Sequence, residues 1–355
     1  MSRITVPSGA VTEAFIGGVL GAVTLPGATP APVQLAVLQA VVTRFARHDP
    51  PPSVERIGRW DAAAVRLVLT DPADRATLAH AAVALELLVH PLPDELEAHV
   101  EHYLRSVGVE APYVAITRDT AREHLGRLHA DLIRNSWYTH RTIEEIFHGH
   151  LRELARSKLS YYAIGDDQEI ARRWRSLEEC PEGSWGAAVA DFYHLHRFPY
   201  PGEPHGIYEV GALHDWVHVL ADYATDAEGE IDVFAFIAGT MADGRGFVQF
   251  IFTLALFQNA SVDTVGGIHI PIARADTLSD PGAADRLADA LWRAAQCTAD
   301  PMAGVDHFAL ADTSLDELRE RWNLPPRTTP GPGALTPGSA RDVRIDLSAH
   351  PPADG

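Results

Sequence analysis

Four potential metal ligands lie within seventeen consecutive positions near the middle of the chain: His214, Asp215, His218 and Glu230. Residues four apart lie on one face of a helix, so the two imidazoles could converge on one ion with Asp215 beside them. Mixed nitrogen and oxygen donors suit a divalent cation, with zinc expected first and iron, cobalt or manganese as alternatives. The spacing therefore predicts a metal site in which these four residues are both ligands and candidate catalytic groups.

The chain has to turn back to bring Glu230 to the two histidines. Residues 226–229 read Asp-Ala-Glu-Gly and are typical of such a turn. Asp favours helix ends, and Gly229 accepts backbone angles that other residues resist. A chance histidine pair is the competing interpretation, because the chain contains 18 His.

The motif and its flanks resemble the signature of the coenzyme Q biosynthesis protein 4 family, which works in ubiquinone assembly. The flanks read YEVGAL over 208–213 and GEI over 229–231. A second match reads AGVDHF over 303–308, followed by a Leu-x-x-x-Arg segment from Leu315 and by Leu324-Pro325. The resemblance covers roughly 165–326, and the first 110 residues are additional to it.

The resemblance implies a metal-dependent enzyme that removes the carboxylate from the ring of a prenylated hydroxybenzoate, by simple or oxidative decarboxylation. An aromatic or isoprenoid small molecule would be its ligand, and other proteins of a biosynthetic complex its partners. The family is also described as an organiser of that complex. A non-catalytic scaffold that binds lipids or quinone intermediates is therefore the first alternative, and a specialised pathway is a variant of the enzyme hypothesis.

A metal phosphohydrolase of the His-Asp type is the second alternative. It would use His214-Asp215 as its central dyad and would require an upstream histidine, His194 or His196, and a downstream aspartate such as Asp243. Glu230 would then have no role.

Further pocket residues are suggested on both sides of the motif. His194 and His196 could carry protons, and Phe234, Phe247 and Phe250 could line a groove for an aromatic or isoprenoid group. Ordinary core packing competes with this interpretation for all five residues.

Helix signals dominate the chain and predict an all-α fold, a multi-helix orthogonal or bundle-like core with an additional N-terminal helical unit. Apolar residues at helical spacing predict helices over 33–47, 75–89 and 94–107, the last capped by Asp94. Residues 1–110 form the N-terminal unit, similar in layout to TerB-like domains, and residues 111–326 the metal-binding domain. Residues 327–355 form a Pro/Gly-rich tail that we expect to be disordered.

One long helix is expected over 117–158, and it contains five histidines. These histidines share no helical face, so the sequence does not predict a second metal site there.

Net charge, cysteine content and apolar runs indicate which partners and which cellular compartment to expect. A net charge of −19 without any Lys/Arg-rich run argues against nucleic acid as a partner. Two cysteines outside any Cys-x-x-Cys pair fit a reducing cytoplasm. The apolar run over 14–25 is expected to be a helix rather than a signal peptide, and the run over 247–257 is shorter than the ~20 residues of a membrane span. Peripheral contact with a membrane and a homodimer remain open.

Overall fold

The computed structural model describes residues 11–46, 49–109, 167–207, 209–241, 245–259, 264–265, 268–269 and 275–337. The predicted helix over 117–158 with its five histidines lies outside these residues, as does Asp243. Helices make up most of the regular structure in the described chain, which confirms the predicted all-α class. The exception is a pair of two-residue antiparallel strands, β1 (Thr264–Val265) and β2 (Ile268–His269).

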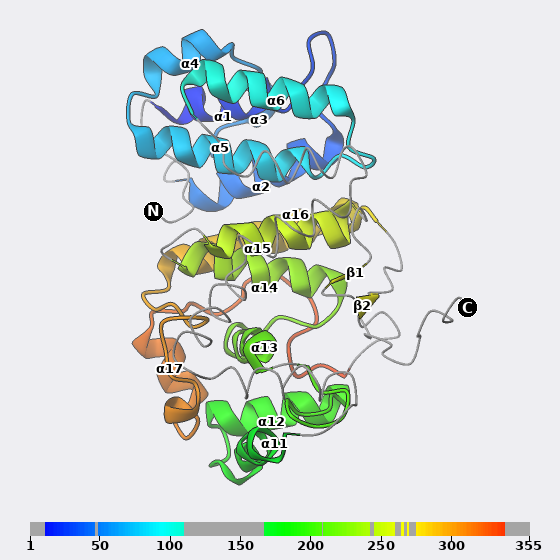
Figure 1. Ribbon diagram of the computed structural model, residues 1–355. Coiled ribbons are helices and arrows are strands. Elements are labelled where there is room, and N and C mark those ends of the chain that lie inside the picture. Colours follow the sequence, from blue (N-terminus) through cyan, green and yellow to red (C-terminus); the bar gives the residue numbers. More distant parts are fainter. Residues whose placement is uncertain are drawn as a thin grey trace, which may run out of the picture.

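The N-terminal helices form the upper layers in Figure 1. They are α1 (Thr12–Ala22), α2 (Pro32–Phe45), α3 (Val54–Ile57), α4 (Ala62–Val68), α5 (Pro72–Glu86) and α6 (Asp94–Val107). Helix α1 comes from the apolar run, is buried over almost its whole length, and packs against α4 and α5. The prediction that Asp94 is the N-cap of α6 is wrong by one position. Pro93 is the N-cap, and Asp94 is the first helical residue, where its charge favours the positive end of the helix dipole.

The remaining helices form the lower layers of the molecule. They are α11 (Gln168–Arg175), α12 (Trp185–His196), α13 (Glu209–Ala221), α14 (Ala227–Thr240), α15 (Arg245–Thr253), α16 (Ala283–Gln296) and α17 (Leu315–Arg321). Four short turns of helix accompany them: η2 (Ser176–Glu179), the π-helical η3 (Leu254–Gln258), η4 (Thr277–Ser279) and η5 (Phe308–Leu310).

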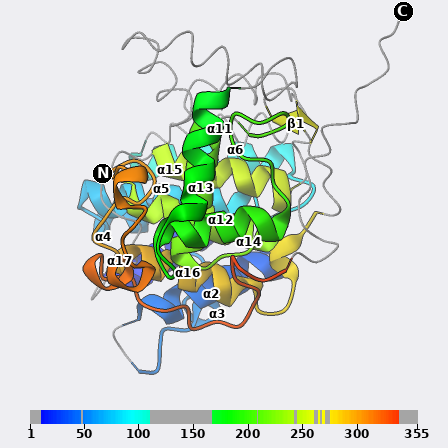
Figure 2. The same cartoon turned by 90° about the horizontal axis from the view of Figure 1, so that it is seen from below.

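Helix α14 stands at the centre of this lower part. It packs against both α15 and α16 on one side and contacts α13 on the other, as Figure 1 shows. Helices α11 and α12 lie beyond α13, and Figure 2 views the chain from that end. The order of layers is therefore α11 and α12, α13, α14, then α15 and α16, and finally the N-terminal helices.

The N-terminal helices and the lower layers share one continuous hydrophobic core. Helix α16 packs along α2, and Arg44 of α2 forms an ion pair of 2.5 Å with the buried carboxylate of Asp289. The Arg44 guanidinium also lies over the ring of Trp292, 4.1 Å from its centroid. Polar and aromatic contacts thus hold the junction between the two predicted units, in addition to apolar packing.

The sequence predicts a disordered chain after residue 326, but residues 327–337 have a defined structure. Ala334 is buried, its N–H donates to Asp222 Oδ1, and its carbonyl accepts from His196 Nε2 at 2.9 Å. Arg327 donates to the carbonyls of Gly331 and Pro332. Backbone hydrogen bonds hold this segment even though it has few apolar side chains.

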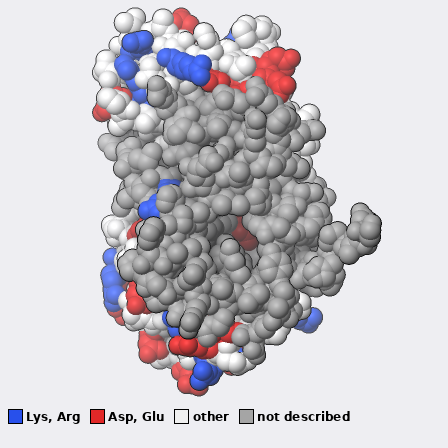
Figure 3. All heavy atoms as spheres, in the orientation of Figure 1, with Lys and Arg blue, Asp and Glu red and all other residues white. Residues whose placement is uncertain are grey.

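None of the described helices combines the length and the apolar composition that a membrane span requires. In Figure 3 the described part of the visible face carries Arg and acidic side chains near one another at the upper and lower ends.

Candidate metal centre

Helix α13 carries the His-Asp-x-x-His motif, and a group of aromatic rings fixes its position. Trp216 is fully buried between Trp185 and Trp174, whose ring centroids lie 5.1 and 6.0 Å away in edge-on geometry. The Trp185 indole N–H donates to the Trp216 carbonyl at 3.0 Å. Edge-on aromatic pairs have a preferred orientation as well as a large buried area, so this packing sets the rotation of α13 about its axis.

Two arginines hold the C-terminal end of α13. Arg319 of α17 donates to the carbonyls of Leu220 and Val219 at 2.9 and 3.2 Å, and Arg293 of α16 donates to the carbonyl of Ala221 at 2.7 Å. The last carbonyls of a helix have no partner within the helix and carry partial negative charge, so both cations stabilise this end. The Leu-x-x-x-Arg segment thus has a structural role that sequence reasoning did not assign.

The turn after α13 brings Glu230 back to the histidines. Asp226 is the N-cap of α14 and accepts from the Gly229 N–H at 2.8 Å. The sequence predicts that Gly229 is needed for its backbone angles. The structure shows instead that glycine is required there because a side chain has no space. A Cβ atom there would lie 2.1 Å from the Ala224 carbonyl oxygen. Glu230 falls in the first turn of α14, where the helix dipole stabilises a carboxylate.

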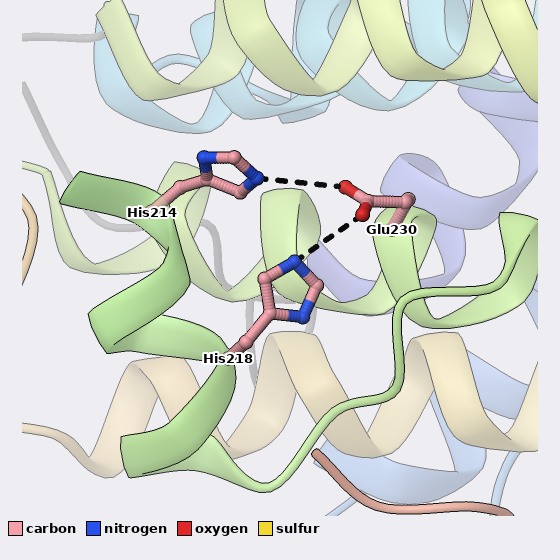
Figure 4. A group of neighbouring side chains, drawn as sticks. All are labelled: His214, His218 and Glu230. Carbon is pink, nitrogen blue, oxygen red and sulfur yellow. Dashed lines mark ion pairs between the residues drawn. The ribbon is translucent and has the colours of Figure 1, made fainter. Parts of the chain in front are cut away.

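His214, His218 and Glu230 converge as Figure 4 shows. His218 Nε2 lies 3.4 Å from Glu230 Oε1, and His214 Nε2 lies 4.0 Å from Glu230 Oε2. One donor atom from each of the three residues falls within 4.8 Å of the others. These three side chains could therefore hold a metal ion.

Backbone carbonyls fix the tautomers of both histidines. His214 Nδ1 donates to the Gly211 carbonyl at 2.6 Å, and His218 Nδ1 donates to the Tyr223 carbonyl at 3.1 Å. Each neutral ring then presents the lone pair of Nε2 to the centre of the cluster. This arrangement, in which the second ring nitrogen donates to a carbonyl, is typical of metal-binding histidines.

The His218 ring supplies the strongest test of whether the residues fit a cation. Its Nε2 atom is buried and makes no hydrogen bond of ordinary geometry. Buried polar atoms in folded proteins nearly always have a partner, and a divalent cation would satisfy this one. The donor set, two imidazole nitrogens and a carboxylate, is one that zinc and the other first-row divalent metals accept.

The three groups also influence one another's protonation. Burial lowers the pKa of His218, but the carboxylates of Glu230 and Asp215 outweigh it, so that this pKa is raised overall. Burial raises the pKa of Glu230, but His218 and His214 outweigh it, so that this pKa is lowered. The carboxylate thus stays ionised and ready to bind a positive charge, whether a proton on His218 or a metal ion.

Asp215 stands beside this group of three. Its Oδ1 atom lies 3.4 Å from His214 Nε2, and its Oδ2 atom accepts a 2.6 Å hydrogen bond from the Tyr193 hydroxyl. Burial raises the pKa of Asp215, with the neighbouring histidines and Tyr193 opposing it. Tyr193 is a residue of the site that the spacing of the motif does not indicate. Only the pairing of α12 with α13 reveals its bond to Asp215.

The three residues of the site differ slightly in their burial. His218 has no exposed side-chain surface, whereas 15 % of the side chain is exposed at both His214 and Glu230. Phe234, one of the predicted pocket residues, is half-buried and stacks on His214 with 5.4 Å between ring centroids. Phe192 stacks on His218 from the protein interior at 5.9 Å. Aromatic rings therefore flank both imidazoles, and only His214 and Glu230 of the three residues keep a small exposed surface.

His194 and His196 do not join the cluster. The His194 side chain is mostly exposed and pairs with Glu178 at 3.0 Å. His196 Nε2 donates to the Ala334 carbonyl, and its ring packs on Phe192. Their predicted role as proton carriers has no support in these contacts, and neither supplies the additional histidine that a His-Asp phosphohydrolase needs.

Phe247 and Phe250 lie on α15, away from the metal cluster. Phe247 packs on His80 of α5, with 4.3 Å between ring centroids, and also contacts Phe250. Both residues line a cavity between α15 and the N-terminal helices, and α14 stands between that cavity and α13. The two residues thus line an apolar cavity, but the structure places that cavity apart from the metal cluster.

Comparisons with known proteins add no information about this site. No known protein family, curated protein or solved structure matches the chain. The functional argument therefore rests on the three converging side chains and on the residues that orient them.

Proposed function

We propose that the chain is a metal-dependent enzyme that decarboxylates the ring of an aromatic, hydroxybenzoate-like substrate. The observation that carries the proposal is the pair of imidazoles, each oriented by a backbone carbonyl, whose Nε2 atoms converge with Glu230. The sequence resemblance to the coenzyme Q biosynthesis protein 4 family supplies the reaction class and suggests a prenylated ring as substrate.

His214, His218 and Glu230 would hold the ion, with Asp215 as a fourth donor and zinc as the first choice of metal. A bound divalent cation supplies Lewis-acid attraction for the phenol and carboxylate oxygens of the substrate. Phe234 forms an apolar wall beside His214 against which an aromatic ring can stack. In the reaction the bond from the ring to the carboxylate breaks, carbon dioxide leaves, and the electron pair stays with the ring carbon, which takes up a proton from water. An oxidative version would also require dioxygen and a redox-active metal.

Elemental analysis of the purified protein by plasma mass spectrometry tests the metal. We expect close to one equivalent of a divalent metal per chain, lost in the His214→Ala, His218→Ala double variant. The matched control is a His102→Ala, His194→Ala double variant, because both of these histidines are exposed. A full equivalent of metal in the first variant would overturn the site.

Release of carbon dioxide from carboxyl-labelled hydroxybenzoates, with and without a prenyl chain, tests the reaction. We expect release by the metal-loaded protein and none by the double variant at 214 and 218. Tight metal binding with no exchangeable water and no release of carbon dioxide would instead favour the non-catalytic scaffold, in which the ion only braces α13 against α14.

A further inference from the structure

A cavity of about 70 Å³ lies where the N-terminal helices meet the layer formed by α15 and α16. Side chains from α1, α2, α5, α15 and α16 line it, together with Leu254 of η3. Protein interiors contain few voids larger than a water molecule, and a site that holds one water needs only roughly 10–15 Å³ of such volume. This cavity is therefore an unusual feature of an otherwise close-packed core.

The walls of the cavity are apolar. Among the described residues that line it, none carries a full charge, and Thr77 and His80 are the only ones with polar side chains. The Thr77 hydroxyl already donates to the Ala73 carbonyl at 3.0 Å. Burial lowers the pKa of His80 to about 4, so its ring is neutral at physiological pH and packs on Phe247. Water needs two to four polar partners in a buried site, and these walls offer too few.

Polar contacts at two places hold the junction around the cavity. At one, Arg44 pairs with Asp289. At the other, Gln258 donates to the Leu88 carbonyl at 3.0 Å and Asn259 donates to the Val89 carbonyl at 2.7 Å. These bonds fix the spacing of the layers, so the helices cannot close on the void without breaking them.

The backbone beside the cavity is also unusual. Leu254, which lines it, begins the π-helical turn η3. Single π-helical turns are rare and occur frequently at functional sites, because they shift the side chains that follow out of the regular helical register. Here the turn places Leu254 in the cavity wall while Gln258 and Asn259 reach the N-terminal helices.

We infer that this cavity is a binding site for a small uncharged hydrocarbon group, such as a short alkyl chain, separate from the metal centre. Its shape is already formed, its walls are apolar, and its location between two layers is where ligand sites commonly occur. Its volume is roughly half of the 150 Å³ at which an apolar cavity accepts benzene, so the group is smaller than an aromatic ring. The inference does not depend on the proposed reaction, because α14 lies between the two sites.

Methyl-resolved NMR with ethane and with dissolved xenon as probes tests the inference. We expect shifts confined to the methyl groups that line the cavity, such as those of Leu38 and Leu291. Ala84→Leu fills the cavity from α5 and should abolish these shifts. Ala63→Leu adds the same side chain at an exposed position of α4 and should leave them intact.

A second variant keeps the test decisive if Ala84→Leu does not fold. Leu254→Ala enlarges the cavity and should allow benzene, which the natural protein excludes, to shift the same methyl groups. Absence of ethane and xenon shifts in the natural protein, or equal shifts in Ala84→Leu, would overturn the inference. The variant that lacks His214 and His218 should bind ethane normally, so failure of the metal site and failure of the cavity are separable.

Discussion

The Tyr193 hydroxyl donates a 2.6 Å hydrogen bond to Oδ2 of Asp215 and leaves Oδ1 of the same carboxylate 3.4 Å from His214 Nε2. Burial and the neighbouring carboxylate raise the pKa of Tyr193 well above its usual value, so the phenol remains a donor. The bond thus selects which oxygen of Asp215 faces the metal cluster.

Replacing Tyr193 with Phe should weaken metal binding by about tenfold or more, the usual cost of losing a group that orients a ligand. Without the phenol, Asp215 can rotate and its charge loses a buried partner. Competition with a chelator measures the affinity, and the absorption spectrum of the cobalt-loaded protein reports any change in the ligand set.

Tyr200→Phe is the matched control for this variant. Tyr200 stacks on Tyr193 at 5.0 Å, but its hydroxyl contacts His194 and not Asp215. Metal affinity in Tyr200→Phe should stay close to that of the natural protein. Equal losses in the two variants would show that aromatic packing matters and that the bond to Asp215 does not.

Metal binding should weaken as the pH falls, beginning above the ordinary pKa of histidine. Without a cation, the carboxylates of Glu230 and Asp215 raise the pKa of His218 despite its burial. Protons therefore compete with the metal for Nε2 throughout the range below this raised pKa, and the competition disappears above it. Chelator competition between pH 8 and pH 5.5 would measure the apparent dissociation constant along this range.

Glu230→Gln separates two effects in the same titration. The variant should bind metal more weakly at every pH because one charged donor is lost. Its pH dependence should also move to lower pH, because the main group that raises the pKa of His218 is gone. An unchanged pH midpoint in Glu230→Gln would contradict the pairing of these two residues.

Arg319→Gln should destabilise the fold by roughly 1.5–3 kcal/mol, the range for hydrogen bonds to a charged group. The change removes the cation that holds the carbonyls of Val219 and Leu220 at the end of α13. Urea unfolding measures the loss. Arg321→Gln is the control, since among the described residues Arg321 pairs only with the exposed Glu317 on its own helix, and the change should cost less than about 0.5 kcal/mol. Similar costs for the two would refute the capping role.

His80 should make the fold less stable in acid. Its pKa is about 4 in the folded protein because of burial, against an ordinary value of 6.5. Between pH 6.5 and pH 4 the His80 ring therefore binds a proton in the unfolded chain but not in the folded chain. The free energy of unfolding is retained above pH 6.5 and falls as the pH drops toward 4. Unfolding of His80→Leu between pH 7 and pH 4.5 should show a shallower fall. His102→Leu, at an exposed position of α6, should keep the natural slope.

Local features were accessible from the sequence. The spacing of His214 and His218 places both rings on one face of any helix. Asp226 is of a residue type that favours the start of a helix, and it is the N-cap of α14. Three predicted N-terminal helices over 33–47, 75–89 and 94–107 correspond to helices over 32–45, 72–86 and 94–107. Helical geometry depends on neighbours in the chain, so apolar periodicity and capping residues suffice to locate it.

Tertiary packing decided which faces of those helices meet. Phe247 and Phe250 lie on α15, a helix that is buried along nearly its whole length, so its sequence does not tell which apolar positions face α14 and which face α5. The bond from Tyr193 to Asp215 and the caps from Arg319 join residues 22 and about 100 positions apart. The sequence alone determined that two histidines share a face and that the chain is helical. Only the tertiary structure decided what stands opposite them, because contacts between distant segments depend on the shape and charge of both partners.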